Sequence, residues 1–398
     1  MRICRMSLFV LLLALLMLSG CGHDKAQAAK AEGGLSDKEW IDSMVGKQIE
    51  EKSISDEQKP KQPATSMITM AAAGDMLIHD CIYNAARTKD SYDFKPFFKE
   101  VKPYMDAADL TFANQESMIG GAVLGLSSYP SFNSPFEAGD ALRDAGVDIV
   151  SVANNHTLDR GEQAVMRALK HWDQLGMAYT GAYQSEQDAA SIRILQTPSG
   201  ISAAYLAYTY GTNGIAVPAG KGYLVSMIDQ EKIKRDLAEA RKAADVVVLS
   251  LHFGNEYERI PNAKQKALVQ FAADHGADVV LGHHPHVLQP IEWVPGKNGY
   301  QTLVAYSLGN FISGQKGTYK QTGGLLTWQV TKTSGSAGQA EIRVSKPAFM
   351  PTYVKYGEWK PRPMFRLKNK EIPGVEQAYA GIKKHMAQWM PELAFPDE

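Results

Sequence analysis

The chain has 398 residues, of which 44% are hydrophobic and 21% charged, an ordinary composition for a globular protein. Its formal net charge of −1 provides no basic field, which argues against nucleic acid as a partner. Three cysteines, one of them at position 4, are too few for a disulfide framework.

The first 21 residues have the pattern of a bacterial lipoprotein signal. Arg2 and Arg5 precede an apolar run at residues 8–18, which is short for a transmembrane helix, and Leu-Ser-Gly-Cys then ends at Cys21. This resemblance predicts cleavage before Cys21, its acylation, and an extracytoplasmic protein anchored by lipid to the bacterial cell membrane. The alternatives are an uncleaved anchor or a plain secretory signal, and both also place the body outside the cytoplasm.

Residues 22–65 are predicted to be a tether and linker. Residues 22–35 are mostly small and polar, residues 36–54 favour a short charged helix, and residues 55–65 contain two prolines among many charges. We therefore expect one domain at residues 66–355, followed by a C-terminal extension at 356–398 with a helix near 374–389.

Strand and helix patterns alternate from residue 66 onward. Strands are predicted at 66–75, 108–116, 147–156, 191–197, 201–209, 245–252, 278–284, 289–294, 302–310, 323–331 and 340–346. Helices are predicted at 136–146, 162–176, 229–244 and 262–276. Unbroken apolar runs such as 246–251 are typical of strands covered on both faces, so the pattern indicates an α/β protein with a mixed or two-layered sheet.

Six short segments at or just after the ends of predicted strands hold most of the candidate functional residues. Ligands of open α/β sheets bind beyond the carboxyl ends of the strands, so the segments are expected to converge on one site. Their oxygen and imidazole donors, without a thiolate, suit a hydrolytic centre with one or two divalent metal ions. The candidates are Asp75, His79, Asn114, Glu116, Asn154, Asn155, His156, His252, His283, His284, His286 and Asn310.

The chemistry of each candidate permits a role. The expected metal ligands are Asp75, Glu116, Asn155, His252, His284 and His286. His156 can protonate a leaving group, and Asp159 either orients His156 or caps the helix that begins near residue 161. The remaining candidates are expected to contact substrate or to support the ligands: His79, Asn114, Asn154, His283 and Asn310.

The segments ANNHTLDRG, GHHPHV and SLGNF resemble those of the bacterial capsule-synthesis proteins of the CapA/PgsA family, which is linked to poly-γ-glutamate production. That family is similar to the calcineurin-like metallophosphoesterases, which implies a four-layered α/β/β/α sandwich over roughly residues 66–330. The resemblance implies that Glu116 is the bridging carboxylate, in place of an aspartate, and that His156 acts on the substrate. It places further metal ligands at Asp75, Asn155, His252, His284 and His286.

One position departs from the phosphoesterase pattern. Those enzymes carry a histidine two residues after the first aspartate, and Leu77 stands there in this chain, with His79 two residues further on. Either His79 substitutes for it or one metal site is incomplete. The donor set suits Mn, Fe, Zn or Mg, as one ion or two.

Two functions remain open from the sequence. The first is a membrane-anchored, metal-dependent hydrolase or transferase acting on an anionic envelope polymer such as poly-γ-glutamate. The alternative is a non-catalytic accessory subunit that binds the polymer or docks on membrane synthase subunits. The missing histidine and the C-terminal extension favour the alternative, and metal content together with turnover separates the two.

Overall fold

The computed structural model describes residues 64–297, 299–335 and 340–396, which all belong to one unit at residues 34–398. The predicted signal with Cys21, nearly all of the tether and the charged helix at 36–54 lie outside the described residues. None of the described helices combines the length and the apolarity needed to cross a membrane.

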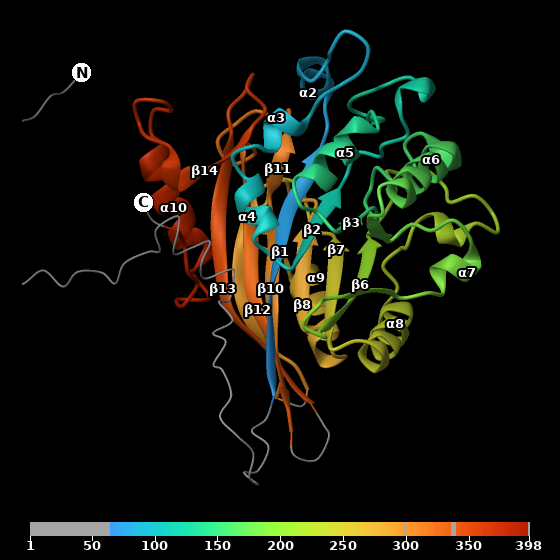
Figure 1. Cartoon of the computed structure of the whole chain (residues 1–398), viewed down its shortest axis with the longest axis vertical. Coiled ribbons are helices and arrows are strands. Elements are labelled where there is room, and N and C mark those ends of the chain that lie inside the picture. Colours follow the sequence, from blue (N-terminus) through green and yellow to red (C-terminus); the bar gives the residue numbers. More distant parts are fainter. Residues whose placement is uncertain (1–63, 298, 336–339, 397–398) are drawn as a thin grey trace, which may run out of the picture. The chain divides into compact units, whose positions relative to one another are not determined.

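The strands of the described residues form two sheets (Figure 1). The first sheet has the order β14-β13-β12-β1-β2-β3-β4, with β11 paired to β1. Its strands are β1 (Thr65–Leu77), β2 (Leu110–Gln115), β3 (Ile149–Ser151), β4 (Ala178–Thr180), β11 (Asn310–Ser313), β12 (Thr322–Ser334), β13 (Ala340–Val354) and β14 (Pro361–Pro363).

The second sheet has the order β5-β6-β7-β8-β10-β9. Its strands are β5 (Arg193–Gln196), β6 (Ser202–Thr209), β7 (Val246–His252), β8 (Val279–His283), β9 (Leu288–Pro295) and β10 (Gln301–Leu308). β5 and β6 pair antiparallel and confirm the strands predicted at residues 191–197 and 201–209.

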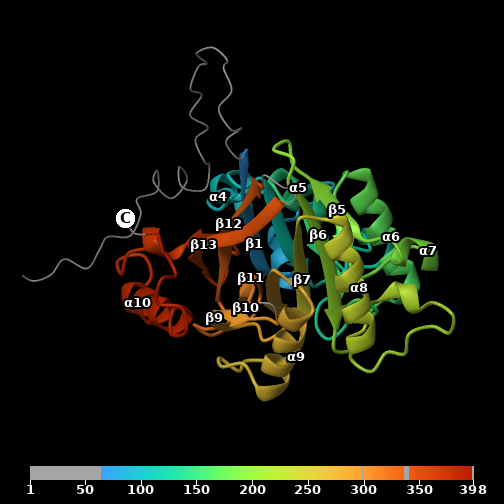
Figure 2. The same ribbon diagram turned by 90° about the horizontal axis from the view of Figure 1, so that it is seen from below.

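Helices cover the outer faces of both sheets. Figure 2 shows α4 and α5 on one side of the strands and α8 and α9 on the other. The helices are α2 (Asp80–Ala85), α3 (Lys95–Phe98), α4 (Lys102–Asp106), α5 (Glu137–Asp144), α6 (Gly161–Gln174), α7 (Glu186–Ala189), α8 (Gln230–Ala243), α9 (Ala263–Asp274) and α10 (Val375–Met386). Single 3₁₀ turns are η1 (Ala122–Leu124), η2 (Gly222–Leu224) and η3 (Met364–Arg366). The four long helices predicted in the body and the helix near the C-terminus are confirmed.

Apolar clusters between the layers hold them together. Strand β1 contributes alternate side chains to two of these clusters. Met70 and Ala72 point into the cluster between the sheets, whereas Ala71 and Ala73 point toward the cluster beneath the helices of the first sheet. A third cluster lies between the second sheet and helices α8 and α9. Alternate side chains of a strand face opposite sides, so a continuous apolar run satisfies both layers. The predicted four-layered α/β/β/α sandwich is confirmed.

The segment predicted as a C-terminal extension contributes to these layers. β14 pairs with β13 and forms the edge of the first sheet, and Val375, Ile382 and Met386 of α10 join the cluster between the sheets. The short elements α2, α3, α4, β4 and β14 were not predicted, because three to six residues carry too little periodicity to stand out.

Candidate metal centre

The predicted site residues converge because the strands that carry them run parallel and end together. Asp75 on β1 lies opposite Asn114 on β2 and Asn310 on β11, and His252 on β7 lies opposite His283 on β8. The two sheets meet at this edge. Nδ1 of His283 is 3.0 Å from Oδ1 of Asp75, and the convergence expected from the sequence is thereby confirmed.

Two groups of potential metal donors share one carboxylate. The first consists of Glu116, His252 and His284, and the second of Asp75, Glu116 and His286; in each, the donor atoms lie within 4.8 Å of one another. Oδ1 of Asn155 is 2.8 Å from Nε2 of His252, which places this predicted ligand beside the first group. Glu116 is the residue that the two groups share, and its role as a bridging ligand stays a prediction.

A third group adds a carboxylate that the sequence did not single out as a ligand. Glu256, His284 and His286 also bring donor atoms within 4.8 Å of one another. The two histidines are buried, while Glu256 is exposed, so it lies on the solvent side of the centre. It follows β7 by only four residues, in the same segment as His252.

Unpartnered polar atoms show that this donor set fits a cation. Glu116 is 0% exposed, yet neither of its oxygens has a hydrogen-bond partner among the described residues, and the same holds for Nδ1 of His252 and of His284. The imidazoles of His252 and His286 approach Glu116 only to 3.6 and 3.5 Å. A buried carboxylate without hydrogen bonds is costly, and a divalent cation between the two groups would satisfy it. Oxygen and imidazole donors without thiolate are the ligands that Mn, Fe, Zn and Mg accept.

The two carboxylates of the centre have pKa values shifted in opposite directions. Burial raises the pKa of Glu116 well above its ordinary value. Burial acts in the same direction on Asp75, but hydrogen bonds from His283 and His286 outweigh it and hold the pKa of Asp75 well below its usual range. Asp75 is therefore a fixed anion in the metal-free protein, whereas Glu116 retains affinity for a proton.

The pKa values of the imidazoles are also shifted in different directions. Burial and the neighbouring imidazole of His286 lower the pKa of His284 to about 3, and burial lowers the pKa of His252 well below its ordinary value. Burial alone would lower the pKa of His286, but the effect of the Glu116 and Asp75 carboxylates is larger. The pKa of His286 is therefore raised to about 9. His252 and His284 are thus neutral, which is the form that binds metal.

The loop after β8 has a strained backbone that positions two of the ligands. His284 and His286 have positive φ angles of 98° and 57°, which are uncommon for residues with a side chain. They flank Pro285, whose carbonyl accepts a hydrogen bond of 2.8 Å from the backbone N–H of Tyr257. Such strain persists only where the surrounding contacts enforce it, and it is common at functional sites.

His156 and Asp159 form a buried pair beside the centre. Nδ1 of His156 is 2.7 Å from Oδ2 of Asp159, which also accepts a 2.7 Å hydrogen bond from the backbone N–H of Phe132. Helix α6 has Arg160 at its N-cap and no side-chain cap, so the alternative in which Asp159 caps this helix is wrong. Asp159 orients His156 and leaves Nε2 of the imidazole for other contacts.

Three asparagines support the predicted ligands through hydrogen bonds. Asn114 donates to Oδ1 of Asp75 at 2.9 Å, and Asn154 accepts from the backbone N–H of His156 at 2.9 Å. Oδ1 of Asn310 lies 3.1 Å from Nδ1 of His286, which fixes Nε2 of that ring toward Glu116 at 3.5 Å. Such partners set the tautomer and orientation of metal-binding histidines.

His79 does not take the place of the missing histidine in this geometry. Its Nδ1 lies 3.1 Å from both the carbonyl of Leu77 and the backbone N–H of Gly314, and the residue belongs to none of the three donor groups of the described chain. Among the histidine, cysteine, aspartate and glutamate side chains of the described residues, the second donor group consists of Asp75, Glu116 and His286. The structure favours the reading in which one metal site is incomplete.

Two residues at the site were missed by the sequence analysis. Asn213 accepts a 3.1 Å hydrogen bond from Nδ2 of Asn155 and lies 3.4 Å from Nδ1 of His156. The ring of Tyr210 lies 4.7 Å from that of His284. The Asn-Gly dipeptide at 213–214 is a turn signal, and Asn213 has a φ of 52°, but nothing in the pattern pointed to the metal centre.

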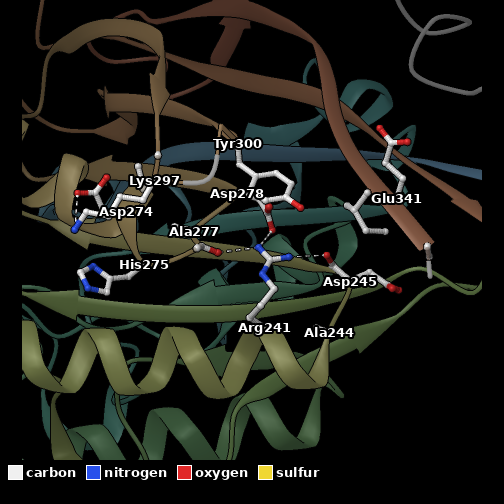
Figure 3. A pocket seen from close by; sticks show the side chains of 15 residues that line it. Arg241, Ala244, Asp245, Asp274, His275, Ala277, Asp278, Lys297, Tyr300 and Glu341 are labelled. Atoms are coloured by element: carbon white, nitrogen blue, oxygen red, sulfur yellow. Dashed lines mark hydrogen bonds and ion pairs between the residues drawn. The ribbon is translucent and has the colours of Figure 1, made fainter.

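A separate pocket of about 620 Å³ lies at the opposite end of the second sheet, before β7 and β8 begin (Figure 3). Its main charged groups are engaged with each other or with neighbouring lysines. Arg241 pairs with Asp278, and Lys332 lies 2.8 Å from Asp245. These ion pairs leave Arg241 and Asp245 engaged within the protein.

Comparison with known proteins agrees with this geometry. The family model for the bacterial capsule synthesis protein PGA_cap matches residues 69–315. The PGA biosynthesis protein CapA of Bacillus subtilis (strain 168) is 28% identical over 297 residues, covering 71% of this chain and 73% of that protein. The capsule biosynthesis protein CapA of Bacillus anthracis is 26% identical over 289 residues, covering 70% and 67%.

Solved structures similar to this chain include two phosphoesterases. A candidate 5′-nucleotidase from Staphylococcus aureus, in complex with alpha-ketoglutarate, is 15% identical with a TM-score of 0.43; the match covers 79% of this chain and 58% of that one. The purple acid phosphatase PPD1 from yellow lupin is 11% identical with a TM-score of 0.33, covering 70% and 53%. The chain thus spans little more than half of either structure. Because the family model covers most of the chain and every segment of the candidate metal centre, this protein belongs to the bacterial capsule synthesis protein family PGA_cap.

Proposed function

We propose that this protein is an extracytoplasmic, lipid-anchored, metal-dependent hydrolase or transferase that acts on an anionic envelope polymer such as poly-γ-glutamate. The observation that carries the proposal is the position of Glu116, buried without hydrogen-bond partners and shared by two groups of donors. Membership of the capsule synthesis family and the names of two CapA relatives support the choice of polymer.

The residues divide into those that would hold the cation and one that acts on the substrate. Asn155, His252 and His284 would hold a cation on one side of Glu116, and Asp75 and His286 would hold one on the other. A bound divalent cation supplies Lewis-acid polarisation of a substrate oxygen and lowers the pKa of a coordinated water. His156, oriented by Asp159, is placed to donate a proton to the leaving group.

A non-catalytic accessory role is the second candidate, and one observation favours it. Leu77 stands where a ligand would be expected, His79 does not replace it, and the second donor group has only three members among the described residues. Such a protein would bind the polymer or membrane synthase subunits without turnover.

The test combines metal analysis with turnover by the full-length protein purified from membranes in detergent. The proposal expects stoichiometric divalent metal and turnover of a γ-linked glutamate polymer or of a small phosphoester such as p-nitrophenyl phosphate. His156→Ala should abolish turnover and keep the metal. His171→Ala is a matched control, because His171 forms a similar 2.7 Å pair with Asp140 outside the centre. Bound metal without turnover of any substrate would establish the accessory role instead.

A further inference from the structure

Two loops beside the metal centre contact each other through two cation–π pairs, and each loop contributes one tyrosine and one cation. Residues 253–262 connect β7 to α9, and residues 314–321 connect β11 to β12. Nζ of Lys320 lies 4.7 Å from the ring centroid of Tyr257, and Cζ of Arg259 lies 4.0 Å from the ring centroid of Tyr319. We call these four residues the cation–tyrosine clasp.

Hydrogen bonds join the clasp to the metal centre. The backbone N–H of Tyr257 donates to Pro285, between the two strained histidines, and its ring lies 6.3 Å from that of His286. Asn310, whose Oδ1 contacts His286, donates through Nδ2 to the carbonyl of Lys320 at 2.8 Å. A ligand at the clasp is therefore a neighbour of anything bound at the centre.

The two cations of the clasp lack carboxylate partners. Within the described chain, no ion pair involves Arg259 or Lys320, and Nε of Arg259 is buried with no hydrogen-bond partner. The carboxylates closest in sequence are occupied: Glu258 accepts a 2.9 Å hydrogen bond from Asn255, and Glu256 faces the histidines of the centre. A guanidinium without a carboxylate partner is suited to bind an external anion in its fork.

The surroundings favour carboxylate over phosphate. Helix α9 begins next to the clasp, but its first N–H groups are taken by the side chain of Asn262, in a capping box with Gln265. The helix terminus therefore offers no free N–H cradle for a phosphate. Tyr257 and Tyr319 are 46% and 52% exposed, so their rings can hold the apolar stem of a side chain while the cations meet its charge.

We propose that the cation–tyrosine clasp is a subsite that binds successive carboxylates of an extended polyanion adjoining the metal centre. This inference takes the identity of the polymer from the proposed function, but it does not require that the protein is catalytic. The clasp selects a chain with repeated carboxylates and apolar spacers, of which γ-linked polyglutamate is the simplest case.

The experiment measures binding of a fluorescent γ-linked glutamate decamer to the full-length protein in detergent at low salt. Arg259→Gln combined with Lys320→Gln should weaken binding about five- to tenfold and flatten its salt dependence. The control removes two charges elsewhere, at Lys234 on α8 and Arg343 on β13, and should bind like the wild type. Arg259→Lys combined with Lys320→Arg should retain most of the affinity, and thermal unfolding checks that every variant is folded.

Three results would overturn the subsite: no binding by the wild type, equal weakening in the control, or tighter clasp-dependent binding of polyphosphate of matched length. The subsite and the proposed function fail separately. Turnover of p-nitrophenyl phosphate without decamer binding would contradict the subsite and would support the metal-dependent enzyme. If decamer binding depends on the clasp but no substrate is turned over, the subsite is supported and the proposed enzymatic function is contradicted.

Discussion

Asp75 on β1 and His283 on β8 are 208 positions apart in sequence, yet Oδ1 of the one accepts a 3.0 Å hydrogen bond from Nδ1 of the other. This contact joins the two sheets at the edge where the donors gather. Asp75 also contacts His286 and Asn114, whereas Glu116 has no hydrogen-bond partner among the described residues. The centre thus holds one carboxylate that the protein satisfies and one that is left for a cation.

Glu116→Gln should reduce metal binding at both donor groups, because this residue is the member they share. In the presence of a chelator the variant should be more stable than the wild type by about 1–3 kcal/mol at pH 8, since a buried carboxylate without hydrogen bonds is replaced by a neutral group while Asp75 still pairs with His286. Elemental analysis and thermal unfolding with and without chelator measure both effects. Glu162→Gln, which breaks an exposed pair with Lys221, is the control. A chelated Glu116→Gln protein less stable than the wild type would contradict the assignment.

Metal affinity should rise with pH up to about 9. The neighbouring carboxylates, outweighing burial, raise the pKa of His286 to about 9. Below that pH the metal-free centre therefore holds a proton, which a metal ion must displace from the ligand nitrogen. Affinity should increase about tenfold per pH unit for each proton released and level off above pH 9. Calorimetry in two buffers of different ionisation enthalpy counts the protons, and binding without proton release would exclude this coupling.

Asp159→Asn should lower kcat about tenfold or more while leaving metal content unchanged, because the amide no longer fixes the His156 tautomer. Its effect should be smaller than that of His156→Ala. Asp140→Asn is the matched control, since Asp140 forms a 2.7 Å pair with His171 away from the centre. If both aspartate variants lose activity equally, the loss reflects stability rather than orientation of His156.

Local patterns in the sequence predicted an α/β fold and placed the candidate donors at strand ends, whereas the four layers were implied by the family resemblance. The apolar run of β7 and its terminal His252 are contiguous, and the carboxyl ends of parallel strands must share an edge. Asn213 and the cation–tyrosine clasp could not be found in this way. They lie on loops whose positions depend on tertiary contacts, and isolated Asn, Tyr, Arg and Lys residues on a surface loop have no distinguishing pattern. Glu256 was missed as a donor because its relation to His284 and His286 exists only after folding.

Asn213 provides a test of how a loop residue supports the centre. It accepts a hydrogen bond from Asn155 at 3.1 Å and holds a φ of 52°. Asn213→Ala loses the hydrogen bond and strains the backbone, whereas Asn213→Gly loses only the hydrogen bond and relieves the strain. Both should weaken metal binding about tenfold, as outer partners of metal ligands commonly do, while only the alanine variant should lower the unfolding temperature. Titration with Mn or Zn by calorimetry and thermal unfolding separate the two effects. Wild-type metal affinity in Asn213→Gly would show that Asn155 needs no support from this loop.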